Sequence, residues 1–221
     1  MFNRIARRYD FLNRFLSLGI DRYWRKRAVA LLQQRAHVLD VATGTGDLAI
    51  AALRAGARKI NGVDVSERML NIGQEKLKKL NIPFHLIELQ SGDAEQLAFP
   101  DNIFDAVTVG FGVRNFEHTL QGIREMHRVL KPGGILVVLE FSRPRSFPTK
   151  QLYAFYFSVI LPLVGQLFSR DKEAYRYLPD SVARFPEREQ FVELLSTAGF
   201  MDNTFQPMTL GIVTLYTGRK V

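Results

Sequence analysis

Short apolar runs alternate with amphipathic segments along the middle of the chain. The apolar runs have the length and composition of buried strands, and they lie at 37–41, 59–64, 84–89, 104–110 and 134–141. Between them, apolar residues recur at helical spacing over 47–55, 67–80 and 117–130. Strands and helices that alternate in this way predict right-handed β–α–β units and a parallel sheet with helices on both faces.

The two ends of the chain depart from this alternation. The N-terminal end shows helical spacing over 3–16 and 22–34. Near the other end, a helix closed by Gly199 precedes two β-prone runs, 200–208 and 211–217. These runs predict a terminal antiparallel hairpin. An all-parallel dinucleotide-binding fold does not need such a hairpin, whereas class I methyltransferases finish their sheet with one.

Together these patterns predict one α/β domain over residues 1–221. The length of 221 residues, with 47% hydrophobic residues, suits a single core of that extent. The expected parts are an N-terminal helical cap (1–35), a cofactor-binding core (36–141), a substrate-side helical insert (142–190), and a last helix with the terminal hairpin (191–221).

The amino-acid composition excludes several kinds of functional site. The chain has no cysteine, which excludes disulfides, zinc–thiolate sites and a cysteine nucleophile, and fits a reducing cytoplasm. The four histidines, at 37, 85, 118 and 127, have no ligand spacing, so we expect no metal. The N-terminal end is rich in arginine without an apolar stretch behind it, so we expect no signal peptide. A cytoplasmic location follows from these expectations.

Most of the net charge of +8 lies at the N-terminal end of the chain. Residues 1–27 hold eight bases and only two acids. Three interpretations stay open for this cluster: a solvated helical face, contact with an anionic membrane surface, and contact with nucleic acid.

A glycine-rich turn, Gly44-Thr45-Gly46, follows the first predicted strand and opens a helix. Glycine lets the backbone approach a ligand closely, and the helix N-terminus offers N–H groups to anionic ligand groups. Asp64 lies 20 residues after Gly44, where a carboxylate would hold a ribose diol. The pattern predicts an adenosine-bearing cofactor, but it fits a dinucleotide as well as S-adenosylmethionine.

Two further acidic positions favour the sulfonium cofactor. Asp40 lies at the end of the first strand, where a carboxylate would oppose a pyrophosphate but suit the ammonium and sulfonium of S-adenosylmethionine. After the third strand, Asp93 is placed to meet the adenine amino group, and the small Ala94 leaves room for the ring. For Asp93, a simple turn or N-cap role is the alternative. These positions therefore favour a methyl donor over a hydride carrier.

Several longer stretches are specific enough to indicate a family. They are RRYDFLNRFLSLGIDRYWRKR, VLDVATGTGDL, GVDVSERML, GDAEQLAFPDNIFDAVTVGFGVRN, MHRVLKPGGILVVLEFSRP and YRYLPDSVARFP. Over nearly its whole length the chain resembles the ubiquinone/menaquinone biosynthesis C-methyltransferases. The resemblance implies a class I, Rossmann-like fold with a seven-stranded sheet and S-adenosylmethionine as cofactor. It also implies C-methylation of a polyprenylated quinol, either demethylmenaquinol or the benzoquinol precursor of ubiquinol.

The resemblance also assigns cofactor contacts to individual positions. A serine that contacts the cofactor in some members is Gly110 here, so any hydroxyl contact at that position is lost. The candidate cofactor-binding residues, from the turn and from the resemblance together, are Asp40, Gly44, Thr45, Gly46, Asp64, Asp93 and Ala94.

Arg114 is the candidate catalytic residue. It lies at the carboxyl edge of the fourth strand, where its cation would lower the pKa of a quinol hydroxyl. The resemblance implies that Arg114 initiates catalysis through a bound water. Because a guanidinium is a poor base, we favour charge stabilisation together with water positioning. The alternative role is an ion pair that fixes the loop. Candidate substrate-pocket residues are Tyr9, Asp10, Asn115 and Tyr175.

Residues 151–169 carry no charge between Lys150 and Arg170. The length would allow a transmembrane span, but Pro162 and Gly165 interrupt it, and the chain must return to add its hairpin to the same sheet. Two interpretations stay open: a buried cap helix, and a wall of the polyprenyl-tail groove or a membrane-facing surface. We expect peripheral contact with the anionic inner face of the cell membrane. The oligomeric state stays open, with a homodimer among the alternatives.

Three other functions compete with this reading. Two observations disfavour a nucleic-acid methyltransferase. Enzymes that methylate cytosine C5 need a cysteine, and this chain has none. Enzymes that methylate exocyclic amines carry an Asp/Asn-Pro-Pro-aromatic motif after the fourth strand, where this chain has Gly110-Phe111-Gly112-Val113. We therefore expect no nucleic-acid partner. A nicotinamide-dependent oxidoreductase and a non-catalytic cofactor-binding protein are the remaining alternatives, and binding and activity assays distinguish them.

Overall fold

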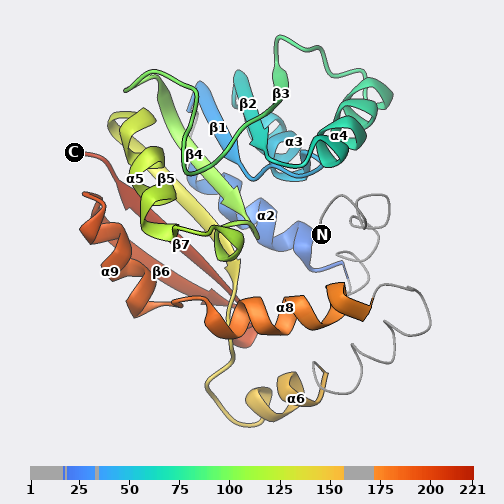
Figure 1. The fold of residues 1–221 in the computed structure, drawn as a ribbon, viewed down its shortest axis with the longest axis vertical. Helices are drawn as coiled ribbons and strands as arrows, with labels where there is room; N and C mark the ends of the chain where they lie inside the picture. Colours follow the sequence, from blue (N-terminus) through green and yellow to red (C-terminus); the bar gives the residue numbers. More distant parts are fainter. Residues whose placement is uncertain (1–16, 18, 33–34, 157–171) are drawn as a thin grey trace.

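The computed structural model describes residues 17, 19–32, 35–156 and 172–221 (Figure 1). Its centre is a seven-stranded sheet with the strand order β3-β2-β1-β4-β5-β7-β6. The strands are β1 (His37–Val41), β2 (Lys59–Asp64), β3 (Ile87–Ser91), β4 (Phe104–Gly110), β5 (Leu130–Phe141), β6 (Met201–Met208) and β7 (Val213–Arg219). Strands β1 to β5 pair in parallel, whereas β7 runs antiparallel to both β5 and β6. The predicted parallel sheet with a C-terminal antiparallel hairpin is confirmed.

Helices cover both faces of the sheet (Figure 1). On one face lie α2 (Asp21–Val29) with its 3-10 extension η1 (Ala30–Leu32), α3 (Asp47–Arg54) and α4 (Glu67–Lys79). On the other face lie α5 (Thr119–Val129) and α9 (Glu189–Thr197). Between β5 and α9, the insert forms α6 (Thr149–Phe155) and α8 (Lys172–Arg184). Helix α8 contacts η2 (Val113–Asn115), the 3-10 turn that follows β4, so the insert lies beside the carboxyl edge of the sheet.

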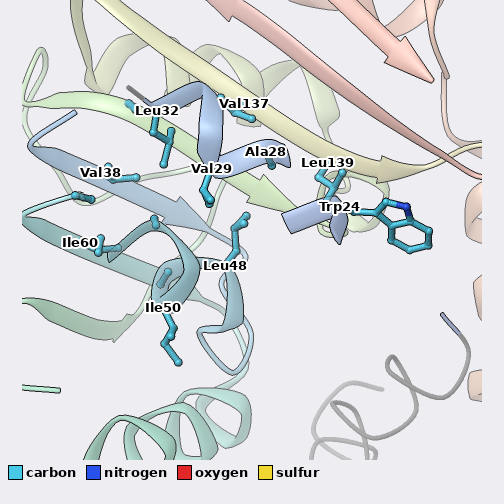
Figure 2. Close-up of a cluster of buried hydrophobic side chains, with 14 of the residues drawn as sticks. Trp24, Ala28, Val29, Leu32, Val38, Leu48, Ile50, Ile60, Val137 and Leu139 are labelled. Atoms are coloured by element: carbon cyan, nitrogen blue, oxygen red, sulfur yellow. The ribbon is translucent and has the colours of Figure 1, made fainter. Parts of the chain in front are cut away.

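Helix α2 is part of the apolar core of the sheet (Figure 2). Trp24, Ala28 and Leu32 recur every four residues, so α2 and η1 turn one apolar stripe toward the sheet. The indole of Trp24 is 2% exposed, and its Nε1 donates a hydrogen bond to Thr209 Oγ1 at 2.7 Å. Its ring centre lies 6.0 Å from that of Phe111, which borders the site described below. Packing of α2 therefore also supports the carboxyl edge of β4.

Of the five strands predicted before the hairpin, three have the predicted bounds and two differ for local reasons. The hairpin strands predicted over 200–208 and 211–217 are β6 at 201–208 and β7 at 213–219. The predicted strand over 84–89 starts only at Ile87, because a turn occupies its beginning: the N–H groups of Leu86 and Ile87 donate to the carbonyl of Pro83. The strand predicted over 134–141 starts already at Leu130, which pairs with Phe104 before a shift in register.

The helical regions outside the core differ more from the sequence expectations. The helix expected over 22–34 ends as an α-helix at Val29 and continues only as η1. The helix expected over 3–16 lies outside the described residues. Of the apolar stretch 151–169, the structure describes 151–156, and there Leu152 and Phe155 are 64% and 56% exposed. For this part, the interpretation as a buried cap helix is wrong. Within the described ranges, no helix is long and apolar enough to cross a membrane.

Candidate active site

The loops that follow β1, β2, β3 and β4 meet at the carboxyl edge of the sheet and enclose a cleft of about 270 Å³. Its lining includes five predicted residues, Gly44, Asp64, Asp93, Ala94 and Asn115. An adjoining hollow of about 40 Å³ is lined by Asp40, Thr45 and again Gly44. The strand order reverses between β1 and β4, which is where ligands bind in open α/β sheets.

The turn between β1 and α3 requires glycine. Gly44 and Gly46 have φ angles of 57° and 79°, which L side chains rarely adopt. A Cβ atom added at Gly44 would meet nothing within 4 Å, so this part of the turn leaves room beside the cleft. Gly46 lies behind the cleft, as the residue that precedes α3, and its added Cβ would approach Leu89 at 3.6 Å. The backbone at Gly44 therefore borders open space, whereas Gly46 lies packed against Leu89 in the turn.

Asp64 lies at the carboxyl end of β2 and supports the glycine-rich turn. Its Oδ2 accepts a hydrogen bond from the N–H of Gly44, and its Oδ1 accepts one from the N–H of Ser66, each at 2.8 Å. Burial raises the pKa of Asp64, and the two hydrogen bonds oppose that rise. Each carboxylate oxygen has a further lone pair for a ligand hydroxyl. The geometry thus fits the predicted ribose contact.

Asp40 is a buried carboxylate at the base of the hollow, 1% exposed. Its two oxygens accept hydrogen bonds from Thr43 Oγ1 at 2.6 Å and from Thr108 Oγ1 at 2.7 Å. Burial raises the pKa of Asp40 to about 6, and the hydroxyl bonds reduce that rise. A carboxylate that is costly to ionise gains much from a cationic ligand beside it. The hollow therefore suits the positively charged end of a ligand.

Asp93 and Ala94 border the cleft after β3, as predicted. Asp93 is exposed, and its Oδ1 also accepts a hydrogen bond from the N–H of Glu95 at 2.9 Å. The turn role that the sequence allowed for Asp93 is therefore present together with its place at the cleft. Ala94 is 8% exposed, and its side chain is a single methyl group at the wall of the cleft.

A chain of polar contacts connects the glycine-rich turn to α4 and α2. Lys76 of α4 donates from Nζ to Thr45 Oγ1 and to Asp47 Oδ1, each at 2.7 Å. Asp47 Oδ2 lies 3.5 Å from Arg25 Nη1, and Arg25 in turn pairs with Asp21. Sequence analysis missed Lys76 and Arg25, because no local pattern links residues as distant as Thr45 and Lys76, 31 positions apart.

Arg114 lies in η2 and is held by Glu140 near the end of β5. The Nη1 of Arg114 lies 2.7 Å from Glu140 Oε1, and the backbone N–H of Arg114 donates to Oε2 at 3.3 Å. Nη1 also donates to the carbonyl of Phe111. The side chains of Arg114 and Glu140 are 5% and 0% exposed. The sequence allowed two roles for Arg114, and the ion pair that was the alternative role is therefore present. In any catalytic role, Arg114 would act while it is paired with Glu140.

Asn115 borders the cleft and is tied to the insert. The hydroxyl of Tyr177, on α8, donates to Asn115 Oδ1 at 2.9 Å. Tyr175 also lies on α8, but its side chain is outside what the structure describes, as are residues Tyr9 and Asp10 altogether. Sequence analysis missed Tyr177 and Glu140. Both lie in stretches that carry the family resemblance, YRYLPDSVARFP and MHRVLKPGGILVVLEFSRP, and this resemblance was the one signal that could have pointed to them.

The described residues fit an elongated, adenosine-bearing ligand with a cationic end. Carboxylates border both parts of the site, with Asp64 and Asp93 in the cleft and Asp40 in the hollow. The space beside Gly44 lets a ligand lie against the backbone between the two parts. Within the described part of the chain, no group of three His, Cys, Asp or Glu side chains is placed to hold a metal ion.

The sheet with its antiparallel hairpin, the glycine-rich turn after β1 and the acidic residues after β2 and β3 define a class I methyltransferase. Solved structures have the same fold. A Thermotoga maritima S-adenosylmethionine-dependent methyltransferase, described as a possible histamine N-methyltransferase, matches with a TM-score of 0.69 and 21% identity, over 100% of this chain and 98% of that one. Phosphoethanolamine N-methyltransferase 2 of Haemonchus contortus, in complex with S-adenosylmethionine, matches with a TM-score of 0.65 and 17% identity, over 96% and 59%.

Sequence relatives identify the family. A model of the ubiE/COQ5 methyltransferase family matches residues 1–220. The chain is 48% identical over 225 residues to the ubiquinone/menaquinone biosynthesis C-methyltransferase UbiE of Geobacter sulfurreducens, covering 100% of this chain and 87% of the relative. It is 46% identical over 224 residues to the demethylmenaquinone methyltransferase of Porphyromonas gingivalis, covering 100% and 91%. The chain belongs to the ubiE/COQ5 methyltransferase family, and the predicted resemblance is confirmed.

Proposed function

We propose that the protein transfers the methyl group of S-adenosylmethionine to a ring carbon of a polyprenylated quinol. The observation that carries the proposal is that a carboxylate-bordered cleft and a buried guanidinium lie at the same edge of the sheet. The cleft is bordered by carboxylates after β2 and β3, and Arg114, in the turn after β4, pairs with Glu140 near the end of β5. The names of the two relatives, which refer to ubiquinone and menaquinone biosynthesis, support the same substrate class.

The cofactor, when bound, supplies an activated methyl group. Asp64 would hold the ribose hydroxyls, and Asp93 the adenine amino group, with Ala94 leaving space for the ring. Asp40 and Thr45 would face the methionine end. Unit charges about 4 Å apart attract each other by a few kcal/mol at a partly screened site, so the cationic end gains from the buried Asp40 carboxylate.

Arg114 would act on the quinol. A quinol ring carbon becomes nucleophilic when the neighbouring hydroxyl loses its proton, and a nearby cation lowers a phenolic pKa of about 10 by roughly 1–3 units. Glu140 and the carbonyl of Phe111 fix the orientation of the guanidinium. Its planar set of N–H donors suits the developing charge on the quinol oxygen and a positioned water.

The overall step balances without a metal or a redox partner. A bond forms between the quinol ring carbon and the methyl carbon, the sulfur–methyl bond breaks, and the ring proton leaves to solvent. The chain contributes alignment, because the reacting atoms must lie in line and in contact. Asn115, held by Tyr177, would keep the loop after β4 in place during that step.

We also propose peripheral contact with an anionic membrane, where a polyprenylated substrate resides. Three large apolar side chains are exposed on and beside α6: Phe147 at 81%, Leu152 at 64% and Phe155 at 56%. The exposed base Lys150 lies between them in the chain. Apolar side chains beside a base suit the boundary between lipid headgroups and acyl chains. Flotation with anionic liposomes at low salt tests this contact, and complete absence of binding would refute it.

The direct test of the function is methyl incorporation. The protein is supplied with methyl-labelled S-adenosylmethionine under reducing conditions and offered either demethylmenaquinol or the methoxy-benzoquinol precursor of ubiquinol. Label on a ring carbon of either quinol is the expected result, and it also tells which ring is preferred. Absence of label in both quinols, while an RNA substrate is labelled, would contradict the proposal.

A further inference from the structure

A groove separate from the cofactor cleft runs between α2, α3 and α4. Its volume is about 1010 Å³, and its lining includes the buried Val29 and Ile50, which form an apolar floor, and the exposed Leu80. Among the described lining residues, Asp47 is the single acid beside the bases Arg22, Arg25, Lys26, Arg54, Lys76 and Lys79.

Two of these bases are engaged inside the protein. Arg25 pairs with Asp21 and lies near Asp47, and Lys76 pairs with Asp47 and donates to Thr45. The other four are exposed, and none of them forms an ion pair with a carboxylate in the described ranges: Arg22, Lys26, Arg54 and Lys79. The groove therefore presents four uncompensated positive charges around an apolar floor.

Favourable interaction with helix dipoles explains the positions of only two of these four bases. Arg54 and Lys79 end α3 and α4, where a base interacts favourably with the helix dipole. Arg22 lies in the first turn of α2, where the dipole opposes a base. Lys26 follows it by four residues, so both side chains leave the same face of α2. Helix stability therefore does not explain the base at Arg22.

We propose that this groove binds the anionic headgroups of a lipid bilayer. The charge is complementary, and the apolar floor suits the upper part of acyl chains, which a small soluble anion lacks. The groove also adjoins the active site, because Arg25 and Asp47 line both the groove and the hollow next to the cofactor turn. The inference rests on the proposed function, since a membrane-resident quinol is what makes docking at a bilayer useful.

The experiment compares two variants with the same change in charge. The groove variant carries Arg22→Gln, Lys26→Gln, Arg54→Gln and Lys79→Gln. The control variant carries Gln at four other exposed bases, Arg58, Lys59, Arg124 and Arg219. Binding to phosphatidylcholine vesicles, with and without phosphatidylglycerol, is measured at low salt, alongside methylation of a short-tailed soluble quinol and of a long-tailed quinol in the vesicles.

We expect the groove variant to lose affinity for the phosphatidylglycerol vesicles by about 100-fold or more, because each base near an anionic surface contributes substantially to binding. The control variant should keep most of its affinity. Both should methylate the soluble quinol at the wild-type rate, and only the groove variant should lose activity toward the vesicle-borne quinol. If the fourfold groove variant does not fold, Lys26→Gln with Lys79→Gln should still lose about tenfold in affinity.

Three results would overturn the inference. Equal losses in both variants would mean that binding follows net charge alone. Displacement by glycerol phosphate at concentrations similar to those of lipid would indicate a soluble phosphate ligand. Preferential binding of RNA, abolished only in the groove variant, would assign the groove to nucleic acid. If instead no quinol is methylated while the vesicle results hold, the proposed function fails and the groove assignment stands.

Discussion

The side of the site proposed to hold the cofactor and the side proposed to hold the quinol, called here the cofactor side and the substrate side, are built differently. On the cofactor side, the carboxylate of Asp64 is held by backbone N–H groups of Gly44 and Ser66, so strand ends and turns set the geometry. On the substrate side, Arg114 is held by Glu140, 26 positions away, and Asn115 by Tyr177, 62 positions away. Nearby backbone groups thus hold the carboxylate of Asp64, whereas side chains far away in the sequence hold Arg114 and Asn115. We therefore expect changes on the two sides to affect different kinetic quantities.

The largest effect should come from Arg114→Ala on the substrate side. Loss of a preorganised donor at the developing charge should lower kcat by roughly 100- to 1000-fold, with cofactor affinity unchanged. The change also leaves Glu140 buried without its partner, which costs about 3–5 kcal/mol of folding stability. Turnover, isothermal titration with the cofactor and thermal unfolding measure the three quantities.

The double variant Arg114→Met with Glu140→Gln separates catalysis from folding. It removes the buried charges together, so most of the stability should return while kcat stays low. Recovery of turnover along with stability would mean that Arg114 serves only to hold the loop, and would contradict its catalytic role.

On the cofactor side, Asp64→Ala should mainly weaken cofactor binding. Loss of charged hydrogen bonds of about 1.5–3 kcal/mol corresponds to roughly 10- to 150-fold in the dissociation constant, while kcat at saturation changes little. Asp93→Ala is the matched comparison, since Asp93 is exposed and should cost only a few-fold. Normal cofactor affinity in the Asp64 variant would exclude the ribose role.

The pH dependence of cofactor binding should follow Asp40. Its pKa is raised by burial to about 6, and a cationic ligand binds the ionised form. Affinity should therefore be nearly constant above pH 7 and fall by about tenfold between pH 7 and pH 5. The same raised pKa makes ionisation of Asp40 destabilise the fold as the pH rises through about 6. The variant Asp40→Asn should abolish the slope, and an unchanged slope would refute the assignment.

The smallest effect is expected for Tyr177→Phe, which removes the hydrogen bond to Asn115. A neutral hydrogen bond of about 1 kcal/mol predicts a loss of about fivefold in kcat/KM for the quinol, with cofactor affinity unchanged. Tyr23→Phe, at a tyrosine that is 54% exposed, is the control and should change nothing. In a double-mutant cycle with Asn115→Ala, additive losses would show that the bond does not act on the loop.

Much of the fold was predictable because its signals are local. Three strands, at 37–41, 59–64 and 104–110, have the predicted bounds, since parallel strands buried on both faces are continuous apolar runs. The 13-residue helix α8 was harder to locate, because Pro179 inside it interrupts the helical pattern. The late start of β3 depended on the turn at Pro83, whose hydrogen bonds no periodicity shows.

In the site, too, residues with a local sequence signal were predicted and residues that depend on distant contacts were not. Gly44, Asp64, Asp93 and Ala94 were found from spacing and from the family resemblance, and all of them border the cleft. Glu140 was missed because a carboxylate in a buried strand gives no sign of its partner until the fold brings it against Arg114. The membrane contact, the catalytic role of Arg114 and the substrate roles of Tyr9, Asp10 and Tyr175 stay predictions.

The central claim is that the acid-bordered cleft after β1 to β3 holds the methyl donor. A crystal structure of the protein with S-adenosylhomocysteine tests it most directly. We predict that the ribose lies against Asp64, the adenine beside Asp93 and Ala94, and the amino acid end in the hollow at Asp40 and Thr45. Density for the ligand at another place, with this cleft empty, would contradict the account.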